Sequence, residues 1–338
     1  MCFYILLLQA IGAERNEKRV AVCVVGQLRC TFCKAFEVTR MMHANVKNYD
    51  ALRVSSLSAP WSSNKTLVEL LHDRFFEPLS KSGSAYDVFV VTHAENFPNK
   101  ETAICEAFRP SDINNKLYCA ISNDTLDPPL LPLMHKYIVQ HEERLPRLKK
   151  LRSVQLQLLD LSVCNAMRRS VEQSYNVQYD YMIRARPETV FFEEFPRDWR
   201  TRTWSNAGPK AHLPPPIRPV PNGIEYTSKA WHSSDQPDNK TLIYGTTDYT
   251  CCGNVDTFGI VPRPLFDCYF DRYYRLTTPS VTREKSLIAH ALQHAWDAEA
   301  FCRFAVADCG GRVFETRDIF SHRGGEAPNG ANIKAYFE

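Results

Sequence analysis

The chain has 338 residues, of which 44% are hydrophobic and 12% aromatic, so it can bury a full core in one large α/β domain or in two smaller ones. Its 41 basic and 38 acidic side chains leave a formal net charge of +3. This near balance argues against a nucleic-acid-binding protein, because such domains carry a strong basic excess.

The amino terminus is an apolar run over residues 1–13, followed at once by the charged residues 14–19. The run is too short to cross a bilayer, which takes about 20 helical residues. Its length fits the apolar region of a signal peptide, with cleavage possible after Ala13. We therefore expect residues 1–17 to be a signal peptide or a truncated membrane anchor, and any membrane contact to be made through this terminus if it is uncleaved. A wrongly assigned start of a cytosolic chain is the alternative.

Glycosylation acceptors and cysteines favour the secretory pathway. Asn64, Asn123 and Asn239 each begin an Asn-x-Thr tripeptide in a polar stretch, and the chain contains twelve cysteines. A luminal glycoprotein of the Golgi or endoplasmic reticulum, or a secreted one, would use such cysteines in structural disulfides, whose pairing the sequence leaves open. The C-x-x-C of Cys30 and Cys33 leaves a luminal redox protein as a further alternative.

The first element of the chain is predicted to be a buried strand over residues 18–25. It breaks at Gly26 into a loop that carries Gln27 and Arg29, and a helix is expected from about residue 33 to 48. A strand that opens onto a glycine loop is typical of nucleotide sites, although the dinucleotide fingerprint G-x-G-x-x-G is absent.

The next region contains a predicted short helix at 65–76 and a second buried strand at 86–93. His93 ends that strand, and we interpret it as a satisfied structural residue rather than a catalyst. Residues 96–135 are expected to be an irregular insertion with one short strand near 117–121.

A leucine-rich stretch predicts a helix from about residue 136 to 177, and the alternating run after it predicts a strand at 179–186. Pro187 cannot donate to a strand ladder, so the strand should stop near Arg186.

Arg184, Arg186 and Glu188 therefore lie at the carboxyl end of a strand, the edge where open α/β sheets bind ligands. Guanidinium groups suit phosphate oxygens, and a nearby carboxylate suits a divalent cation that bridges a diphosphate. The alternative is an Arg–Glu ion pair that closes a turn.

The carboxyl-terminal part begins with a Pro- and Trp-rich insertion over residues 193–240, which is typical of either a functional lid or a partly mobile segment. Asp256 precedes a short predicted strand at 258–261, and helices are expected at 264–275 and 283–309. The second of these helices carries Glu299 at its middle.

Near the end of the chain a strand is expected at 312–315, followed by a loop in which His322 and Arg323 precede two glycines. These two side chains could close over a phosphate, although a solvated loop is the simpler interpretation.

Taken together, these segments resemble glycosyltransferase domains of the GT-A class. They are most similar to plant and algal families in which the first strand ends in G-x-x-R, a later strand ends in R-x-R-x-D, and an N-D-x-x-x-G segment and an S-E or P-E helix follow. The resemblance runs from residue 18 to about 310 and is carried by the shared order of short motifs. The matching residues are Gly26, Arg29, Arg184, Arg186, Glu188, Asn254, Asp256, Gly259 and Glu299.

The chain departs from the family pattern at two places. Glu188 stands where the pattern has Asp, and the asparagine of the N-D segment is displaced by one residue, which leaves Asn254-Val-Asp256.

The resemblance implies an α/β fold with a mostly parallel, Rossmann-like sheet flanked by helices. It implies a single GT-A-like domain over residues 18–338, interrupted by the two irregular insertions.

The implied activity is transfer of a sugar from a nucleotide-diphosphate donor to an acceptor hydroxyl on a glycan or glycoprotein. Gly26, Gln27, Arg29, Arg184 and Arg186 would bind the donor. Glu188, with His322, would hold Mn²⁺ or Mg²⁺. Asp256 or Glu299 would act as general base or bind the acceptor. The rival hypothesis is a non-catalytic, secreted carbohydrate-binding protein that keeps the fold.

Overall fold

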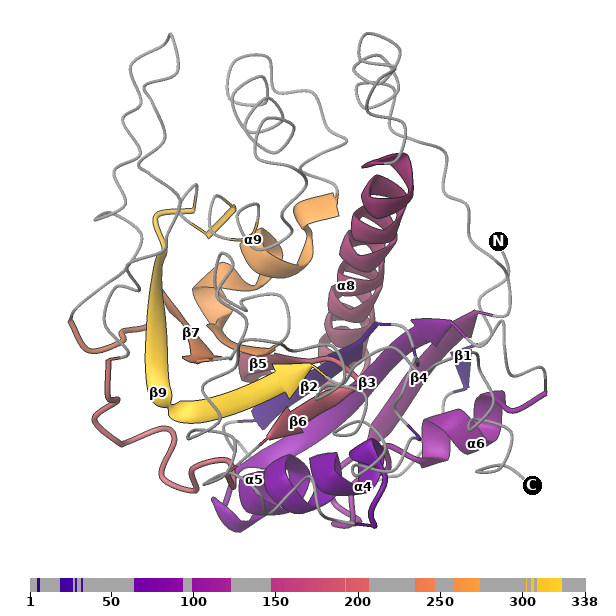
Figure 1. Ribbon diagram of the computed structural model, residues 1–338, viewed down its shortest axis with the longest axis horizontal. Helices are drawn as coiled ribbons and strands as arrows, with labels where there is room; N and C mark the ends of the chain where they lie inside the picture. The colour runs from indigo at the N-terminus through magenta and orange to yellow at the C-terminus, as the bar shows by residue number, and fades with distance from the viewer. Residues whose placement is uncertain are drawn as a thin grey trace, which may run out of the picture.

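The fold is known from a computed structural model, which describes residues 5–6, 19–26, 28, 32, 64–93, 99–122, 147–191, 193–206, 235–246, 258–273, 302, 305–306 and 309–323. These residues build a mixed nine-stranded sheet with the strand order β1-β4-β3-β2-β5-β8-β7-β9-β6 (Figure 1). The strands are β1 (Ile5–Leu6), β2 (Arg19–Val25), β3 (Ala85–His93), β4 (Leu117–Ser122), β5 (Tyr179–Ala185), β6 (Thr189–Phe191), β7 (Thr241–Thr246), β8 (Phe258–Pro262) and β9 (Arg312–Arg323).

The centre of the sheet is parallel, because β4, β3, β2 and β5 all run in the same direction. In the middle of β2, Val22 pairs with Val88 of β3 and with Ile183 of β5. All three side chains are fully buried, as expected for strands covered on both faces. The predicted α/β class with a mostly parallel centre is therefore confirmed, and this arrangement is compatible with a Rossmann-like sheet.

Beyond β5 the sheet becomes mixed. Strand β8 is antiparallel to both β5 and β7, whereas β9 runs parallel to β7 and its far end pairs antiparallel with β6. At the other edge, Ile5 and Leu6 pair antiparallel with β4. The other residues of the predicted amino-terminal segment 1–17 lie outside the described ranges.

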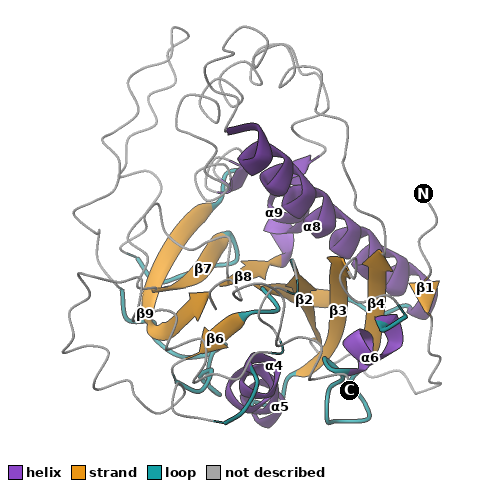
Figure 2. Ribbon diagram, turned by 45° about the vertical axis from the view of Figure 1, so that its right-hand side comes forward, coloured by secondary structure: helices purple, strands orange, loops and turns teal. Residues whose placement is uncertain are grey.

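Helices cover both faces of the sheet. On one face lie α8 (Arg147–Tyr175) and α9 (Phe266–Phe270), and α9 follows the 3₁₀ turn η4 (Arg263–Leu265). On the other face lie α4 (Leu67–Leu71), the π-helical turn η1 (His72–Phe76) and α5 (Glu77–Lys81), as Figure 2 shows. A short helix, α6 (Glu101–Glu106), precedes β4. Each face has its own cluster of buried apolar side chains, so the sheet separates two cores.

Local sequence explains where the helix at Leu67 begins. Thr66 accepts a hydrogen bond from the backbone N–H of Glu69, and the Glu69 carboxylate accepts one from the backbone N–H of Thr66. This reciprocal capping box satisfies two amide groups that a helix start would otherwise leave unpaired. The predicted helix at 65–76 is confirmed, and it continues through η1 and α5 to Lys81.

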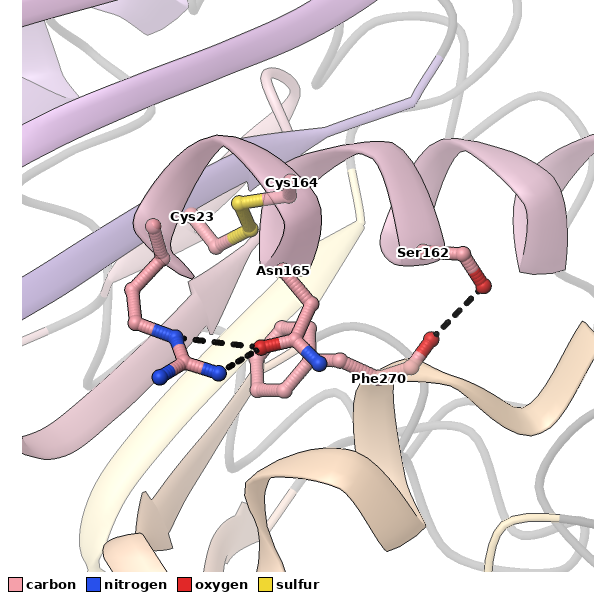
Figure 3. Close-up of a disulfide and its surroundings, with 6 residues drawn as sticks. Cys23, Ser162, Cys164, Asn165 and Phe270 are labelled. Carbon is pink, nitrogen blue, oxygen red and sulfur yellow. Dashed lines mark hydrogen bonds between the residues drawn. A yellow bond between two sulfur atoms is a disulfide. The ribbon is translucent and has the colours of Figure 1, made fainter. Parts of the chain in front are cut away.

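Three disulfides tie the described elements together: Cys23–Cys164, Cys105–Cys119 and Cys268–Cys309. The first joins β2 directly to α8 (Figure 3), where Ser162 Oγ also donates to the carbonyl of Phe270, 3.1 Å away. The prediction of structural disulfides is confirmed for these six cysteines, while Cys30 and Cys33 lie outside the described residues.

The junction between α8 and β5 is fixed by Glu172. Its carboxylate accepts hydrogen bonds from the backbone N–H of Tyr179 at 2.9 Å and from Arg263 Nη1 at 2.6 Å. Burial acts to raise the pKa of Glu172, but these hydrogen bonds and the charge of Arg168 outweigh it, so the pKa lies below its ordinary value. The carboxylate therefore stays ionised and sets the point at which β5 enters the sheet.

Most of the predicted elements that fall on described residues are confirmed. The strands expected at 18–25, 86–93, 117–121, 179–186 and 258–261 form β2, β3, β4, β5 and β8. The strands β1, β6 and β7 and the short helix α6 were not predicted, and the strand expected at 312–315 extends to Arg323. His322 thus lies in a strand, opposite Val190 of β6, and the expectation of a terminal loop there was wrong. The helix expected at 33–48 and most of that expected at 283–309 lie outside the described residues.

Candidate functional site

Polar and charged side chains gather where β3 and β5 end, on the face of the sheet covered by α8 and α9. Met182 of β5 and Val91 of β3 both belong to the apolar cluster beneath α8. Side chains two residues apart on a strand share a face, so Arg184 and His93 lie on that same side. We call the following residues the sheet-edge cluster: His93, Gln157, Asp160, Arg184, Arg186, Glu188, Tyr269 and Arg272.

Gly26 brings the end of β2 against this cluster. Its N–H donates to the carbonyl of Val91, and its own carbonyl accepts from Thr92 Oγ1 at 2.6 Å. The backbone angle φ is +144°, which side chains rarely allow. A Cβ at this position would lie 3.4 Å from Cδ of Pro187 and 3.8 Å from Nε of Arg186. These are ordinary contact distances, so the positive φ is what favours glycine at this position, where β2 ends beside the turn after β5.

A tight turn after β5 holds Arg186 and Glu188. The N–H of Arg186 donates to Thr189 Oγ1, and the N–H of Thr189 donates back to the carbonyl of Arg186, both at 3.0 Å. Pro187 suits the second position of such a turn because its φ is already fixed. Arg186 Nε lies 3.9 Å from Glu188 Oε1, and both side chains are largely buried. This distance matches the ion pair across a turn that the sequence offered as the alternative to a ligand site.

Helix α8 holds the other side of Arg186. Its Nη2 atom donates to Gln157 Oε1, 3.1 Å away. With the backbone fixed by the turn and the guanidinium fixed at both ends, Arg186 has little freedom left. A group held in this way costs little further ordering when a ligand binds to it.

One turn further along α8, Asp160 faces His93. His93 Nε2 lies 3.0 Å and 3.2 Å from the two carboxylate oxygens of Asp160, and both residues are buried. Burial raises the pKa of Asp160, against the opposing effects of the His93 hydrogen bond and the positive charge of Arg184. A buried carboxylate partner such as Asp160 is what a histidine with a structural role requires, in agreement with the interpretation of His93 from the sequence.

Arg184 lies deeper, between Asp160 and Tyr269. Its side chain is fully buried, and Nη1 lies 3.4 Å from the hydroxyl oxygen of Tyr269. Gly259 of β8 pairs with Arg184 across the ladder, and a Cβ on that glycine would come within 3.4 Å of the same hydroxyl. Gly259, one of the residues that carry the resemblance, thus lies directly beside the contact between Arg184 and Tyr269.

A second guanidinium approaches Tyr269 from its ring face. The central carbon of Arg272 lies 4.4 Å from the ring centroid, and the residue is fully buried. Its Nε and Nη1 atoms are buried and have no hydrogen-bond acceptor among the described residues. A desolvated cation–π contact contributes about 2 kcal/mol. Taking an ion out of water costs roughly several kcal/mol, so the ring alone does not compensate the charge.

The described residues do not by themselves form a metal site. Across the ranges that the structure describes, no group of three or more His, Cys, Asp or Glu side chains is placed to hold a metal ion. Glu188 contributes one carboxylate, and it lies beside a guanidinium. The backbone of His322 lies opposite Val190 of β6, and Val190 is two residues after Glu188. Glu188 and His322, the two residues predicted to bind a metal, therefore lie on neighbouring segments. Among the described residues, this donor set is incomplete for a metal ion.

The structure brings together four of the sequence-predicted residues, namely Gly26, Arg184, Arg186 and Glu188. The predicted residues Gln27, Arg29, Asp256 and Glu299 lie outside the described ranges. Sequence reasoning missed Gln157, Asp160, Tyr269 and Arg272. The first two could have been found, because they are polar positions three residues apart on the helix face that also carries Leu161 and Cys164.

Comparison with known proteins assigns no family to the chain. No protein-family model matches the sequence, and no curated protein matches it either. Within the described part of the chain, none of the helices has the length and apolar character needed to cross a bilayer.

Proposed function

We propose that this protein is a GT-A-type glycosyltransferase that moves a sugar from a nucleotide-diphosphate donor to an acceptor hydroxyl on a glycan or glycoprotein. The observation that supports the proposal is the position of Arg184 and Arg186 at the carboxyl end of the central parallel strand β5, with Gly26 packed against Arg186. Open α/β sheets bind nucleotides at this edge.

The chemistry of the transfer explains why arginines would lie there. When the sugar leaves, negative charge grows on the departing nucleoside diphosphate. Fixed guanidinium groups stabilise that charge, and they do so best when they need no rearrangement. Arg186 is held by Gln157 and by the turn that contains Glu188, whereas Arg184 is held beside Tyr269. Both are therefore preorganised for a diphosphate.

The remaining roles rest on the resemblance. Gln27 and Arg29 would contact the nucleotide, and Asp256 or Glu299 would bind the acceptor hydroxyl or remove its proton. Glu188 and His322 are the residues that would contribute to holding Mn²⁺ or Mg²⁺. When bound, such an ion would supply positive charge to the diphosphate oxygens.

The proposed setting is the lumen of the Golgi or endoplasmic reticulum, or the cell exterior. The three disulfides support an oxidising compartment. Asn64 and Asn239 are exposed, as glycan acceptors must be, and Asn123 lies outside the described residues. No contact with nucleic acid is expected from the balanced charge.

One observation favours the rival function, a non-catalytic carbohydrate-binding protein on the same fold. Arg186 and Glu188 form an ion pair with each other, and a pair of this kind can have a purely structural role. The two proposals differ in one property, because the enzyme must bind a nucleoside diphosphate whereas the rival binds glycans without it.

Thermal unfolding in the presence of nucleoside diphosphates tests the proposal. We expect the nucleoside diphosphate with one particular base to raise the melting temperature, and to raise it further when Mn²⁺ is present. A ligand at 100 times its dissociation constant stabilises a fold by about 2.7 kcal/mol. Glu188→Gln should reduce the additional rise caused by Mn²⁺. The matched control is Glu77→Gln on α5, an exposed residue of the opposite face that pairs with Lys81.

The control should respond to nucleotide as the unchanged protein does. If no nucleoside diphosphate shifts the transition, with or without metal, the transferase proposal is wrong. The same assay with a glycan panel then tests the rival.

A further inference from the structure

We propose that Arg272, together with Arg184 and the hydroxyl of Tyr269, forms a binding site for a phosphate-type oxyanion. The site deepens the proposed function and rests on it only for the identity of the ligand, which would be the diphosphate of the donor. The juxtaposition itself depends on geometry alone. A fully buried guanidinium lies 4.4 Å over the ring of Tyr269, and a second one lies 3.4 Å from the hydroxyl of the same side chain.

The hydrogen-bond partners of Arg272 are the first argument. Arg168, a comparable buried arginine on α8, donates from Nε and Nη2 to Asn165 and from Nη1 to Glu172. In Arg272, by contrast, Nε and Nη1 are buried and have no acceptor among the described residues. Buried donors in folded proteins are almost always paired, so these two unpaired N–H groups of Arg272 call for an explanation.

Charge is the second argument. Two guanidinium groups contact Tyr269, and burial raises the pKa of its hydroxyl, so this side chain stays neutral and adds no negative charge. In the sheet-edge cluster, the three described guanidinium groups of Arg184, Arg186 and Arg272 outnumber the two described carboxylates, Asp160 and Glu188. Asp160 already contacts His93, so an anionic ligand would balance the remaining positive charge.

Geometry selects the class of anion. The guanidinium fork presents parallel N–H donors that match the oxygens of phosphate, and a tyrosine hydroxyl can donate a further hydrogen bond. Because the site is buried, water competes little, and each charge-assisted hydrogen bond is stronger than it would be at the surface. A phosphate or diphosphate group fits these requirements.

The site also lies where the proposed transfer needs it. Arg184 and Arg186 are two residues apart on β5 and at its end, and they share the face covered by α8 and α9. Arg272 lies two residues after the end of α9 and packs on the ring of Tyr269, which lies on the same face. A diphosphate bound by Arg186 could thus extend towards Arg184 and Arg272.

The test measures the thermal shift that inorganic pyrophosphate produces in the unchanged full chain and in Arg272→Met. Methionine has a similar length and no charge. We expect pyrophosphate to stabilise the unchanged protein and to have no effect on Arg272→Met. Without ligand, the variant should melt at the same or a higher temperature, because an unpaired buried charge has been replaced by an apolar side chain.

Arg263→Met is the matched control. Arg263 is a half-exposed arginine on η4 that binds Glu172, so its loss should lower the melting temperature while the pyrophosphate shift remains. If Arg272→Met fails to fold, Arg272→Lys replaces it. Lysine keeps the charge but lacks the fork, and we expect the dissociation constant for pyrophosphate to rise at least about tenfold.

Two results would overturn the site: pyrophosphate that leaves the unchanged protein unaffected, or pyrophosphate that stabilises the unchanged protein and Arg272→Met equally. A parallel series with nucleoside diphosphates separates the two proposals. A nucleotide shift that survives in Arg272→Met supports the transferase and removes this site. A pyrophosphate shift lost in Arg272→Met, with no added effect of any nucleoside, supports the oxyanion site and contradicts the transferase.

Discussion

Replacing Cys23 and Cys164 together by alanine is expected to lower the free energy of unfolding by about 5 kcal/mol, the largest effect of any disulfide removal in the described chain. The bond joins residues 141 positions apart and connects the central strand β2 to α8. A cross-link over so long a loop strongly restricts the unfolded chain. Alanine is preferred to serine because both cysteines are fully buried, and a hydroxyl there would need a partner.

Chemical denaturation of three double variants, each lacking one disulfide, checks this expectation. The separations of 41 residues for Cys268–Cys309 and 14 residues for Cys105–Cys119 are shorter. The same entropic relation gives losses of about 4 and 3 kcal/mol for these two bonds. The expected order of stability loss therefore follows loop length. Equal or greater loss on removal of Cys105–Cys119 would contradict the account.

Phe75→Ala is expected to lower the free energy of unfolding by about 3–5 kcal/mol, the range observed for large aromatic deletions in cores. Phe75 is fully buried on the face covered by α4 and α5. The centroid of its ring lies 5.2 Å from the ring centroids of Phe191 and Phe195 and 5.8 Å from that of Phe258. Deleting the ring removes contacts to three separate segments at once.

Equilibrium denaturation of Phe75→Ala and Phe75→Leu tests this packing. Leucine keeps much of the buried volume, so its loss should be clearly smaller than that of alanine. The comparison also tests the packing of the short strand β6, because Phe191 belongs to that strand. If the alanine variant loses less than about 1 kcal/mol, Phe75 does not occupy the centre of a packed cluster.

Parts of the fold that depend on local pattern could be predicted from the sequence. The runs at 18–25 and 86–93 are rich in β-branched residues because nearly every position of β2 and β3 is buried. By contrast, β6 has three residues, and β7 pairs with β9 about 70 residues further along the chain. Strands as short or as non-local as these depend on tertiary pairing, which a single sequence does not encode locally.

The candidate site likewise contains residues that local sequence pattern predicts and contacts that depend on tertiary packing. Arg184, Arg186 and Glu188 could be placed because Pro187 ends the ladder, and Gly26 meets them because β2 and β5 are parallel neighbours. The contact of Asp160 with His93 and that of Arg272 with Tyr269 depend on how α8 and α9 pack on the sheet. No spacing within the sequence indicates those contacts.

Release of nucleoside diphosphate from a panel of nucleotide sugars, with Mn²⁺ present and absent, is the most direct test of the proposed transferase activity. We expect release from one donor above the uncatalysed rate, since a transferase slowly passes its sugar to water. Arg186→Lys should lower kcat/KM at least tenfold, or about 1.4 kcal/mol, because it removes the fork that binds Gln157 and that we propose binds the diphosphate. If none of the donors releases nucleoside diphosphate, or if Arg186→Lys leaves the rate unchanged, the proposed activity is wrong.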